Sequence, residues 1–313
     1  MQNNEIKKVL ICGLGALGLT YAEALNNYCE LKILADKERI EKFRKYPPIL
    51  NKKIVKLDYI TPSDEYNPDL IIIATKNNGL ESAINYIKNF VTPNCIIISL
   101  LNGISSEKRI TERYPDSNVI NSFYIGGSAI REKNEVTKLN GGKIIIPKSA
   151  ETLEKFFKTC NIEYETTQDI VYAQWVKLGV NIVLNQLSAI YRQNVGQVKT
   201  NKDFLPLAKD LIKEIIMVAQ TLKIKNFDNY EQDVLNSINL VANQGKTSML
   251  QDVLAKRKTE VEIFSGEIIN IAKKINIQTP VNKMVYNKIK EVEEAYLWTS
   301  LLYLLEAEAN QYL

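Results

Sequence analysis

Residues 7–18 read KKVLICGLGALG, a short apolar segment followed at once by three glycines in the spacing GxGxxG. Residues 7–11 predict a buried β-strand, and residues 16–26 predict a helix that begins at the glycine turn. In such a strand–turn–helix the first glycine permits the turn, the second lets a pyrophosphate approach the backbone, and the third lets helix and strand pack closely. The predicted dinucleotide-binding residues are therefore Gly13, Leu14, Gly15, Ala16, Leu17 and Gly18. The alternative is a glycine-rich turn that binds no ligand.

The rest of the first half alternates short apolar segments with helical patterns. Segments that are apolar on both faces predict strands at residues 31–34, 70–75 and 96–100, and later strands are expected at residues 119–124 and 142–146. Apolar strands separated by helices are typical of a parallel sheet that is covered on both faces.

The second half differs, because from about residue 170 the pattern is helical almost throughout. Breakers or turns are expected at Pro206, residues 226–229, Gly245 and Pro280. We therefore predict an α/β protein with an N-terminal Rossmann-type parallel sheet domain at residues 1–168. An all-helical C-terminal domain that carries the substrate site follows at residues 169–313.

Composition narrows the possible partners and location. Of the 313 residues 45% are hydrophobic, enough for a sizeable core, and a net charge of only +4 gives no reason to expect nucleic acid. The apolar segments are too short to cross a bilayer, and the start MQNNEIKK lacks the apolar region of a signal peptide. We expect a cytoplasmic protein without a membrane partner.

The residue types available for chemistry are limited. The chain contains no histidine, and its four cysteines form no CxxC pair: Cys12, Cys29, Cys95 and Cys160. We expect small buried thiols in a reducing compartment and no metal site. Without histidine, Ser-His-Asp and Cys-His hydrolases are excluded, as are dehydrogenases that use an imidazole acid. Any proton transfer must involve Lys, Glu, Asp, Tyr, Cys or water.

Asp36 ends the second predicted strand, where a dinucleotide site carries its ribose-reading residue. A carboxylate there accepts hydrogen bonds from both ribose hydroxyls and repels a 2′-phosphate, which favours NAD over NADP. Lys37 and Arg39 follow at once and could instead hold a phosphate. The remaining alternative is that Asp36 only begins a turn.

One narrow face of the apolar helix predicted at residues 169–192 is polar, with Gln174, Lys177, Asn181, Asn185 and Ser188. The usual explanation is a solvent face, but such faces are rich in Glu and Lys pairs. Here no acid occurs between residues 169 and 203. A single lysine beside two asparagines suits a keto acid, because the ammonium donates to the carbonyl oxygen and the amides orient the substrate.

Over nearly its whole length the chain resembles the ketopantoate reductases. The matching segments occur in family order and are the Gly15–Gly18 end of the glycine motif, Thr75-Lys76, Leu101-Asn102-Gly103, Trp175-x-Lys177-Leu178-x-x-Asn181-x-x-x-Asn185, Ser248-Met249-Leu250-Gln251-Asp252, Thr259-Glu260-Val261 leading to Gly266, and Thr279-Pro280-Val281-Asn282.

The resemblance implies a reductase that transfers hydride from NAD(P)H to the ketone of 2-dehydropantoate, giving pantoate for pantothenate and coenzyme A biosynthesis. It implies that Lys177 is the general acid and that Glu260 lies near both the cofactor and the substrate hydroxyl. The implied substrate ligands are Asn181, Asn185, Ser248 and Asn102. The implied cofactor-proximal residues are Lys76, Asn102, Ala129 and Glu260, in addition to the glycine loop and Asp36. Asp252 matches the motif but is expected to be structural.

The match also departs from the family pattern. Asp36 stands where many members carry Arg, and Arg192, Val195 and Gly245 fall where the family often has Asn, with Asn194 and Asn243 nearby. NAD or NADP as cofactor, and the exact 2-keto acid, therefore stay open. The alternatives are a reductase of a different small 2-keto acid on the same fold and a non-catalytic dinucleotide-binding sensor. The helical half could also form a homodimer.

Overall fold

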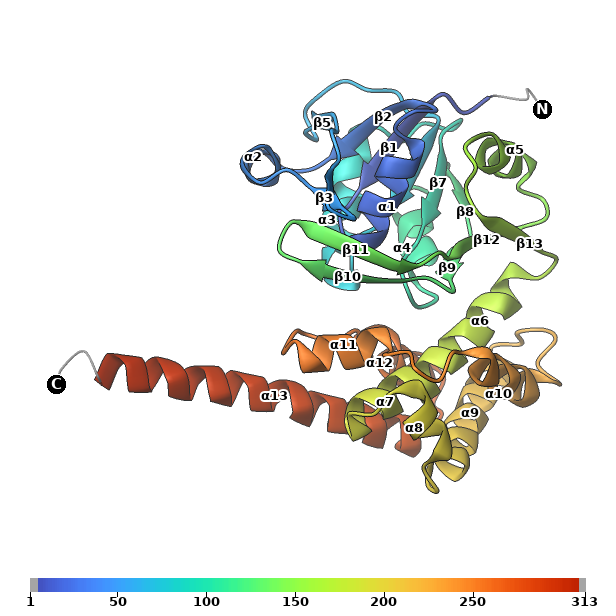
Figure 1. Cartoon of the computed structure of the whole chain (residues 1–313). Coiled ribbons are helices and arrows are strands. Elements are labelled where there is room, and N and C mark those ends of the chain that lie inside the picture. Colours follow the sequence, from blue (N-terminus) through green and yellow to red (C-terminus); the bar gives the residue numbers. More distant parts are fainter. Residues whose placement is uncertain (1–4, 310–313) are drawn as a thin grey trace. The chain divides into compact units, whose positions relative to one another are not determined.

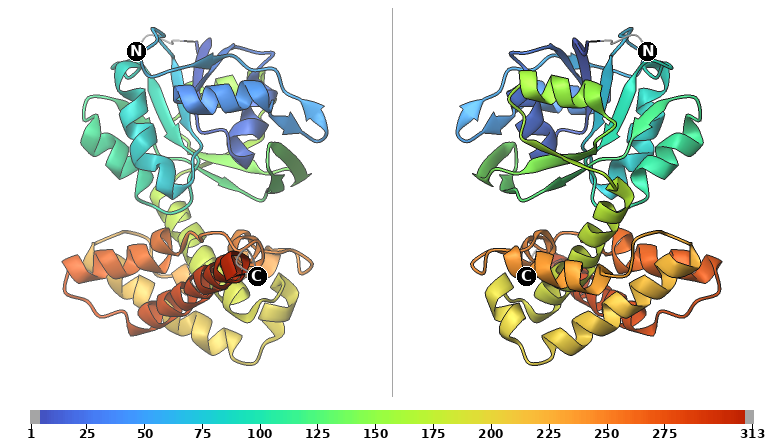
Figure 2. Two further views of the ribbon diagram at one scale, coloured as in Figure 1. Left: turned by 90° about the vertical axis from the view of Figure 1, so that its left-hand side faces the viewer. Right: turned by 90° about the vertical axis from the view of Figure 1, so that its right-hand side faces the viewer.

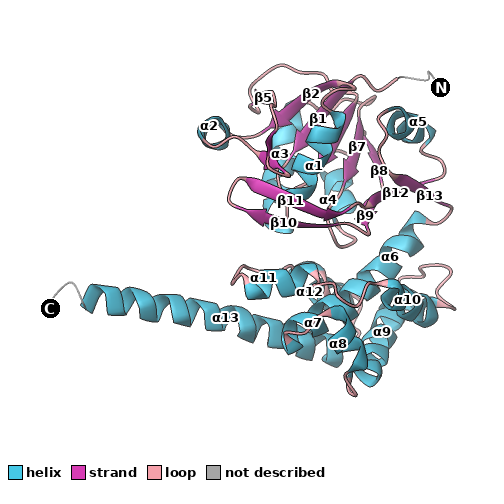
Figure 3. Cartoon of the chain, in the orientation of Figure 1, coloured by secondary structure: helices cyan, strands magenta, loops and turns pink. Residues whose placement is uncertain are grey.

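The computed structural model describes residues 5–309, with side chains described as far as Tyr296. The chain divides into two compact units, the first ending at Gln174 and the second beginning at Trp175 (Figure 1). Within the described residues all strands belong to the first unit, and the second unit is helical (Figure 3). The predicted class, a Rossmann-type sheet followed by a helical region, is confirmed. The unit boundary falls a few residues after the predicted one at 168/169.

The first unit is built on a six-stranded sheet with the strand order β5-β2-β1-β6-β7-β8. All neighbouring strands in it pair in parallel. The strands are β1 (Lys8–Cys12), β2 (Glu30–Leu34), β5 (Tyr59–Ile60), β6 (Leu70–Ile73), β7 (Ile96–Ser99) and β8 (Asn118–Ile120). The chain moves outward in one direction from β1 to β2 and in the other from β6 onward. This reversal creates the switch point beside which open α/β sheets bind ligands.

Helices cover both faces of this sheet because its strands are apolar on both faces. Val9 and Ile11 pack into one buried cluster with side chains of α1 (Ala16–Leu25) and α5 (Glu151–Thr159). Leu10 and Cys12 face the other side, in a cluster with side chains of α3 (Leu80–Tyr86) and α4 (Ser106–Arg113). Figure 2 shows these helices on opposite sides of the strands.

Two smaller sheets complete the first unit. One has the order β10-β11-β3-β4, from β3 (Ile49–Leu50), β4 (Lys53–Ile54), β10 (Ser128–Glu132) and β11 (Glu135–Asn140). The other has the order β13-β12-β9, from β9 (Phe123–Ile125), β12 (Lys143–Pro147) and β13 (Tyr164–Thr167). The single strand predicted at residues 119–124 is therefore wrong, because β8 and β9 belong to different sheets. The remaining helices of this unit are α2 (Lys37–Lys45), η1 (Asn77–Gly79) and η2 (Ile87–Asn89).

The second unit contains α6 (Ile170–Val180), which starts in the first unit, η3 (Asn181–Asn185), α7 (Gln186–Tyr191), α8 (Val195–Thr200), α9 (Phe204–Thr221), α10 (Tyr230–Leu240), α11 (Ser248–Leu254), η4 (Val261–Ile263), α12 (Ser265–Lys274) and α13 (Pro280–Ala309). Pro206 is not a breaker, because it lies in the first turn of α9, where its missing N–H would have no helical partner. Pro280 begins α13, as expected of a residue that cannot continue a preceding helix.

A buried polar chain links four helices of the second unit. The Glu214 carboxylate of α9 accepts hydrogen bonds from the backbone N–H groups of Val281 and Asn282, at 2.8 and 2.9 Å. Both N–H groups lie in the first turn of α13, where backbone donors have no partner within the helix itself. Ser265 of α12 donates to the Asn282 side chain at 2.9 Å and accepts from Gln186 of α7 at 2.8 Å. The chain holds the packed helices in one arrangement because every member is satisfied.

Among the helices of residues 5–309, none has the combined length and apolar character that a membrane crossing requires.

Candidate functional site

The glycine turn after β1 has the geometry predicted from its spacing. Gly13 has φ +103°, and a Cβ there would lie 2.7 Å from the backbone nitrogen of Thr75, so only glycine fits. A Cβ on Gly18 would lie 1.9 Å from the Gly13 carbonyl oxygen, which explains the close packing of α1 on the turn. Gly15 occupies the N-cap position of α1, without a capping side chain. The first N–H groups of α1 are thus left to bind an anion.

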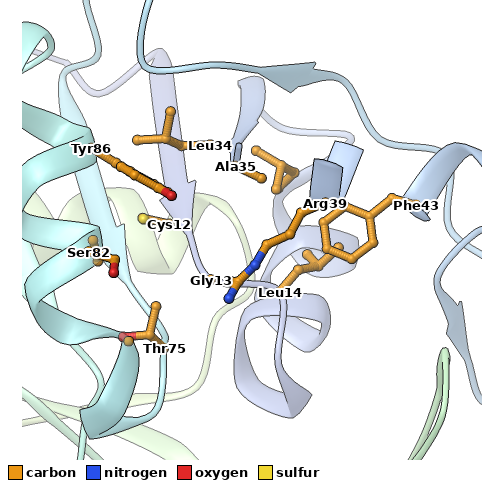
Figure 4. A pocket seen from close by; sticks show the side chains of 13 residues that line it. Cys12, Gly13, Leu14, Leu34, Ala35, Arg39, Phe43, Thr75, Ser82 and Tyr86 are labelled. Carbon is orange, nitrogen blue, oxygen red and sulfur yellow. The ribbon is translucent and has the colours of Figure 1, made fainter. Parts of the chain in front are cut away.

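A pocket adjoins this turn within the first unit (Figure 4). Its walls come from the ends of β1, β2 and β6 and from α2 and α3, and include Leu34, Ala35, Phe43, Thr75 and Ser82. The side chains of Arg39 and Tyr86 also line it. Burial raises the pKa of the Cys12 thiol in the pocket wall to about 12, so this cysteine is a packing residue rather than a nucleophile. The pocket offers an apolar slot with charged and polar groups at the switch point of the sheet.

Asp36 has more than one partner at the edge of this pocket. Its Oδ1 accepts the Arg39 backbone N–H at 2.8 Å, which caps α2. Its Oδ2 accepts from the Tyr86 hydroxyl at 3.3 Å and lies 3.5 Å from the Arg39 guanidinium. Burial and the Asp36 charge both raise the pKa of Tyr86, so its hydroxyl stays a donor. Asp36 therefore caps a helix, where the alternative expected only a turn, and it still presents a carboxylate after the end of β2.

The predicted cofactor-proximal residues follow neighbouring strands of the sheet. Lys76 comes after β6 and precedes η1, with an exposed side chain, and Asn102 comes after β7 and is half-buried. The carboxyl ends of parallel neighbours lie at one edge of a sheet, the edge that also carries the glycine turn. Ala129 lies in β10 at a register shift and packs against the buried cluster that contains α1.

Arg131 is a residue of this region that no sequence motif indicated. It lies in β10, and its Nη1 donates to the backbone carbonyl of Leu14, the middle residue of the glycine turn, at 2.7 Å. Nothing in residues 128–140 marks this contact, because it depends on how the β10–β11 hairpin folds back over α1.

The second unit gathers the predicted substrate amides. Asn181 and Asn185 are each 9% exposed, and Asn185 Nδ2 donates to Asn181 Oδ1 at 2.8 Å. Asn185 Oδ1 accepts from the Ser248 hydroxyl at 3.1 Å and from the Met249 backbone N–H at 3.3 Å. The Asn181 Nδ2 group is buried and has no hydrogen-bond partner in the described chain. A buried donor of this kind is costly, which makes it a candidate ligand-binding group.

A π-helical turn, η3, underlies this arrangement. The predicted continuous α-helix at residues 169–192 is instead α6, then η3 from Asn181 to Asn185, then α7. Turns of this kind are rare and often occur at functional sites. Lys177, which is half-buried, lies four residues before Asn181, near the end of α6.

Burial rules out the solvent-face explanation for most of the predicted polar stripe. Gln174 is 5% exposed and Ser188 is fully buried, and both are used in internal hydrogen bonds. Gln174 Nε2 donates to Glu107 at 2.9 Å within the first unit. The Ser188 hydroxyl lies 3.0 Å from that of Thr247. Of the buried amides in this stripe, only Asn181 keeps a donor that has no hydrogen-bond partner among the described residues.

The C-terminal motifs combine candidate ligands with anchoring residues. Thr247, not Ser248, caps α11, because its hydroxyl accepts the Leu250 N–H at 3.2 Å. Asp252 forms an ion pair with Arg257 at 2.8 Å, as expected of a structural residue.

Glu260 is half-buried immediately before η4. The preceding residue, Thr259, donates through both its backbone N–H and its hydroxyl to Glu293 of α13, at 2.7 Å each. Glu260 is thus carried on an anchored segment.

The positions that depart from the family pattern are occupied by local structure. Asn194 caps α8, with its side chain accepting the Gln197 N–H at 2.9 Å. Arg192 ends α7 with φ +53°. The Val195 N–H donates to the Gly245 carbonyl at 3.0 Å. Asn243 Oδ1 accepts from Lys199 at 3.3 Å.

Comparison with known proteins identifies the family. The family models "Ketopantoate reductase PanE/ApbA" and "Ketopantoate reductase PanE/ApbA C terminal" match residues 9–151 and 169–293. The 2-dehydropantoate 2-reductase of Pyrococcus horikoshii is 30% identical over 91% of this chain and 97% of its own length. That of Aquifex aeolicus is 26% identical over 92% of this chain and 97% of its own length.

Solved structures share the fold. A D-mandelate dehydrogenase in complex with NADH and anilino(oxo)acetate superposes with a TM-score of 0.82 at 21% identity, covering 92% of this chain and 99% of the other. A PanE/ApbA family ketopantoate reductase from Ralstonia eutropha gives a TM-score of 0.78 at 21% identity, covering 93% and 99%. A dimeric ketopantoate reductase from Staphylococcus aureus gives 0.73 at 22%, covering 92% and 99%. From the two family matches and the sequence identity to its relatives, we conclude that the chain belongs to the ketopantoate reductase family of NAD(P)-dependent oxidoreductases.

Proposed function

We propose that this protein reduces the ketone of 2-dehydropantoate with NAD(P)H and releases pantoate. The observation that carries the proposal is the pair of buried amides Asn181 and Asn185, which the hydroxyl of the exposed Ser248 joins. Within the described chain the Asn181 Nδ2 donor has no hydrogen-bond partner, and Lys177 lies four residues before Asn181. Such a donor suits an oxygen-rich ligand. The relatives that match over nearly the whole chain are named 2-dehydropantoate 2-reductases.

The residues of the first unit fit a nicotinamide dinucleotide. Any side chain at Gly13 would clash, and the uncapped start of α1 offers N–H groups to a pyrophosphate. The neighbouring pocket is lined by apolar side chains together with Tyr86 and Arg39, and this lining would suit an apolar ring system. When bound, the cofactor supplies the hydride, so that the protein has to bind, orient and stabilise charge.

The proton is proposed to come from Lys177. Its ammonium donates a hydrogen bond to the ketone oxygen, stabilises the negative charge that develops there, and delivers the proton to the alkoxide. Asn181 donates to the substrate, Ser248 binds the substrate carboxylate, and Asn185 holds both in place through its three hydrogen bonds. Glu260 is proposed to accept from the substrate hydroxyl.

For the choice of cofactor, NADH is the preferred proposal. Asp36 Oδ2 stands at the end of β2, where it would accept from ribose hydroxyls and repel a 2′-phosphate. Arg39 lines the same pocket and favours NADPH, which makes NADPH the second candidate. Steady-state kcat/KM with NADH and with NADPH decides between them. A strong preference for NADPH would contradict the Asp36 argument.

A different small 2-keto acid is the second candidate substrate. Val195 and Gly245 stand at two positions where family members often carry Asn, and here they are joined by a backbone hydrogen bond. The neighbouring Asn194 caps α8. The test is steady-state reduction of 2-dehydropantoate and a panel of other 2-keto acids with each cofactor. Higher kcat/KM for another acid would replace the substrate, and dinucleotide binding without any turnover would favour a sensor.

Assembly and location are further proposals. The four cysteines form no disulfide in the structure, which supports a reducing compartment such as the cytoplasm. We propose that two copies of the chain form a homodimer through their helical units. Light scattering of the purified protein tests this by measuring its molar mass in solution.

A further inference from the structure

The β10–β11 hairpin brings a cation onto the glycine turn. Arg131 pairs with Val136 of β11, which is 1% exposed and anchors the hairpin in the core. From this anchored position the Arg131 Nη1 donates to the Leu14 carbonyl at 2.7 Å, and its Nε donates to the Lys133 carbonyl at 3.2 Å. The guanidinium is thus held against the loop by hydrogen bonds at both ends.

The guanidinium lies on the ligand side of the loop. In a GxGxxG turn the second glycine lacks a Cβ so that the pyrophosphate can approach the backbone. A Cβ built on Gly15, that second glycine, would lie 4.0 Å from Arg131 Nη1 and 3.7 Å from the Ala74 carbonyl oxygen. The space that Gly15 leaves open therefore has a guanidinium on its border.

The charge of Arg131 is not neutralised by the protein. Within the described chain its hydrogen-bond partners are two backbone carbonyls, and no carboxylate forms an ion pair with it. Arg131 as a whole residue is exposed, but partial desolvation of its guanidinium, and then the charge of Arg39, lower the pKa of Arg131. Arg39 is paired with Asp36, whereas Arg131 has no carboxylate partner in the described chain, so a guanidinium beside an uncapped helix start is suited to bind an anion.

We propose that Arg131 is a ligand of the cofactor pyrophosphate. This inference rests on the dinucleotide binding proposed above and adds a residue from outside the glycine motif. In the complex, a pyrophosphate oxygen would accept from the guanidinium, while the Arg131–Leu14 hydrogen bond keeps the guanidinium on the bound side of the loop. Because the pyrophosphate is common to NADH and NADPH, Arg131 would strengthen the binding of both, whereas a ligand of the 2′-phosphate would act on NADPH alone.

The test measures dissociation constants of NADH, NADPH and ADP by calorimetry for the wild type, Arg131→Ala and Arg131→Gln. Gln removes the charge but keeps a polar side chain with an amide donor, so it also covers the case in which the Ala variant fails to fold. Lys138→Ala is the matched control, because Lys138 is an exposed cation of the same hairpin, opposite Ala129. Loss of a hydrogen bond to a charged group should weaken all three ligands by about 10- to 100-fold in both Arg131 variants. Lys138→Ala should stay within about twofold of the wild type.

Failure of this inference can be distinguished from failure of the proposed function. A loss confined to NADPH, or unchanged affinities with only a lower Tm, would overturn the assignment of Arg131 to the pyrophosphate and leave the proposed function standing. If the wild type itself binds neither dinucleotide, the proposed function and this inference both fail. A weaker salt dependence of NADH affinity in Arg131→Gln than in the wild type gives further support, because salt screens a charge pair.

Discussion

Asn185 shows how one side chain can serve both folding and binding. Its Nδ2 donates to Asn181, and its Oδ1 accepts from Ser248 and from the backbone of α11. Its amide oxygen is thus committed to the protein, whereas the Asn181 Nδ2 is not. The two asparagines therefore have different functions, although they looked equivalent in the sequence.

Lys177→Ala should lower kcat by about 10²-fold or more, the usual contribution of a positioned acid. The dissociation constant of NADH should change little, because the glycine loop remains intact. Stopped-flow and steady-state measurements of NAD(P)H oxidation provide both values. Lys213→Ala, which removes an exposed lysine of α9, should retain wild-type turnover. Near wild-type kcat in Lys177→Ala would refute the assigned role.

Asn181→Ala should raise the KM for the keto acid at least about tenfold, since a hydrogen bond to a charged ligand is lost. Its cost to folding should be about 1 kcal/mol, the net value of the single hydrogen bond to Asn185. Asn236→Ala is the control, because it removes an exposed Asn side chain that accepts from Gln232 on α10. If the KM of Asn181→Ala changes as little as that of Asn236→Ala, Asn181 does not contact the substrate.

At the residue scale, the candidate site was partly predictable. The spacing of Asn181 and Asn185 places them one turn apart on a helix, so their contact followed from periodicity, whereas the joint role with Lys177 stays a prediction. Arg131 was not predictable, because its contact with Leu14 spans 117 positions of the sequence. Gln174 was assigned to the same stripe, but its partner Glu107 lies on a different element, which periodicity cannot indicate.

Most elements were predictable where a strong apolar pattern met a turn. Strands β1, β2, β6 and β7 lie at the predicted positions, with ends that differ by one or two residues. The β10–β11 hairpin was missed because most of its residues are polar and exposed, and its turn uses Lys133 at φ +52° rather than a glycine. Tertiary contact, not local pattern, makes this segment a hairpin.

A buried carboxyl joins two helices and one loop of the first unit. Glu107 of α4 accepts from Ser106 at 2.7 Å, from the N–H of Ser122 at 3.3 Å, and from Gln174 of α6 at 2.9 Å. Burial nevertheless raises the pKa of Glu107 above its ordinary value of 4.5, because the hydrogen bonds only partly offset desolvation.

Because the folded protein holds this proton more tightly than the unfolded chain, the free energy of unfolding should fall as pH rises from 4.5 through the raised pKa. Glu107→Gln keeps the shape and an acceptor, so it should remove this pH dependence and equal or exceed the wild type in stability at pH 8. Urea unfolding across pH 4 to 8 measures the effect. The exposed Glu112→Gln variant of the same helix should retain the wild-type slope. If the free energy of unfolding of Glu107→Gln falls with pH as steeply as that of the wild type, Glu107 is not the source of the pH dependence.

At the scale of the whole molecule, ligand binding is linked to stability. A dinucleotide that binds only the folded protein should stabilise it by about 2.7 kcal/mol at 100 times its Kd, visible as a rise in Tm. The test variant is Gly15→Ala, because its added Cβ meets only ordinary contacts of 3.7 and 4.0 Å in the protein but would occupy space proposed for the pyrophosphate. This variant should fold with nearly unchanged Tm and lose most of the dinucleotide-induced shift. A full shift in Gly15→Ala would place the cofactor elsewhere.

The π-turn at residues 181–185 has an evolutionary consequence. Loss of a single codon there would let the peptide wind regularly from Lys177 into α7, and the relaxed helix would be expected to hold itself together at least as well. The same event would turn Asn185 by about one residue's rotation relative to Asn181 and Lys177, which precede the deletion. Selection for robustness alone would thus tend to erase the irregularity, and its persistence in a lineage would report selection for chemistry.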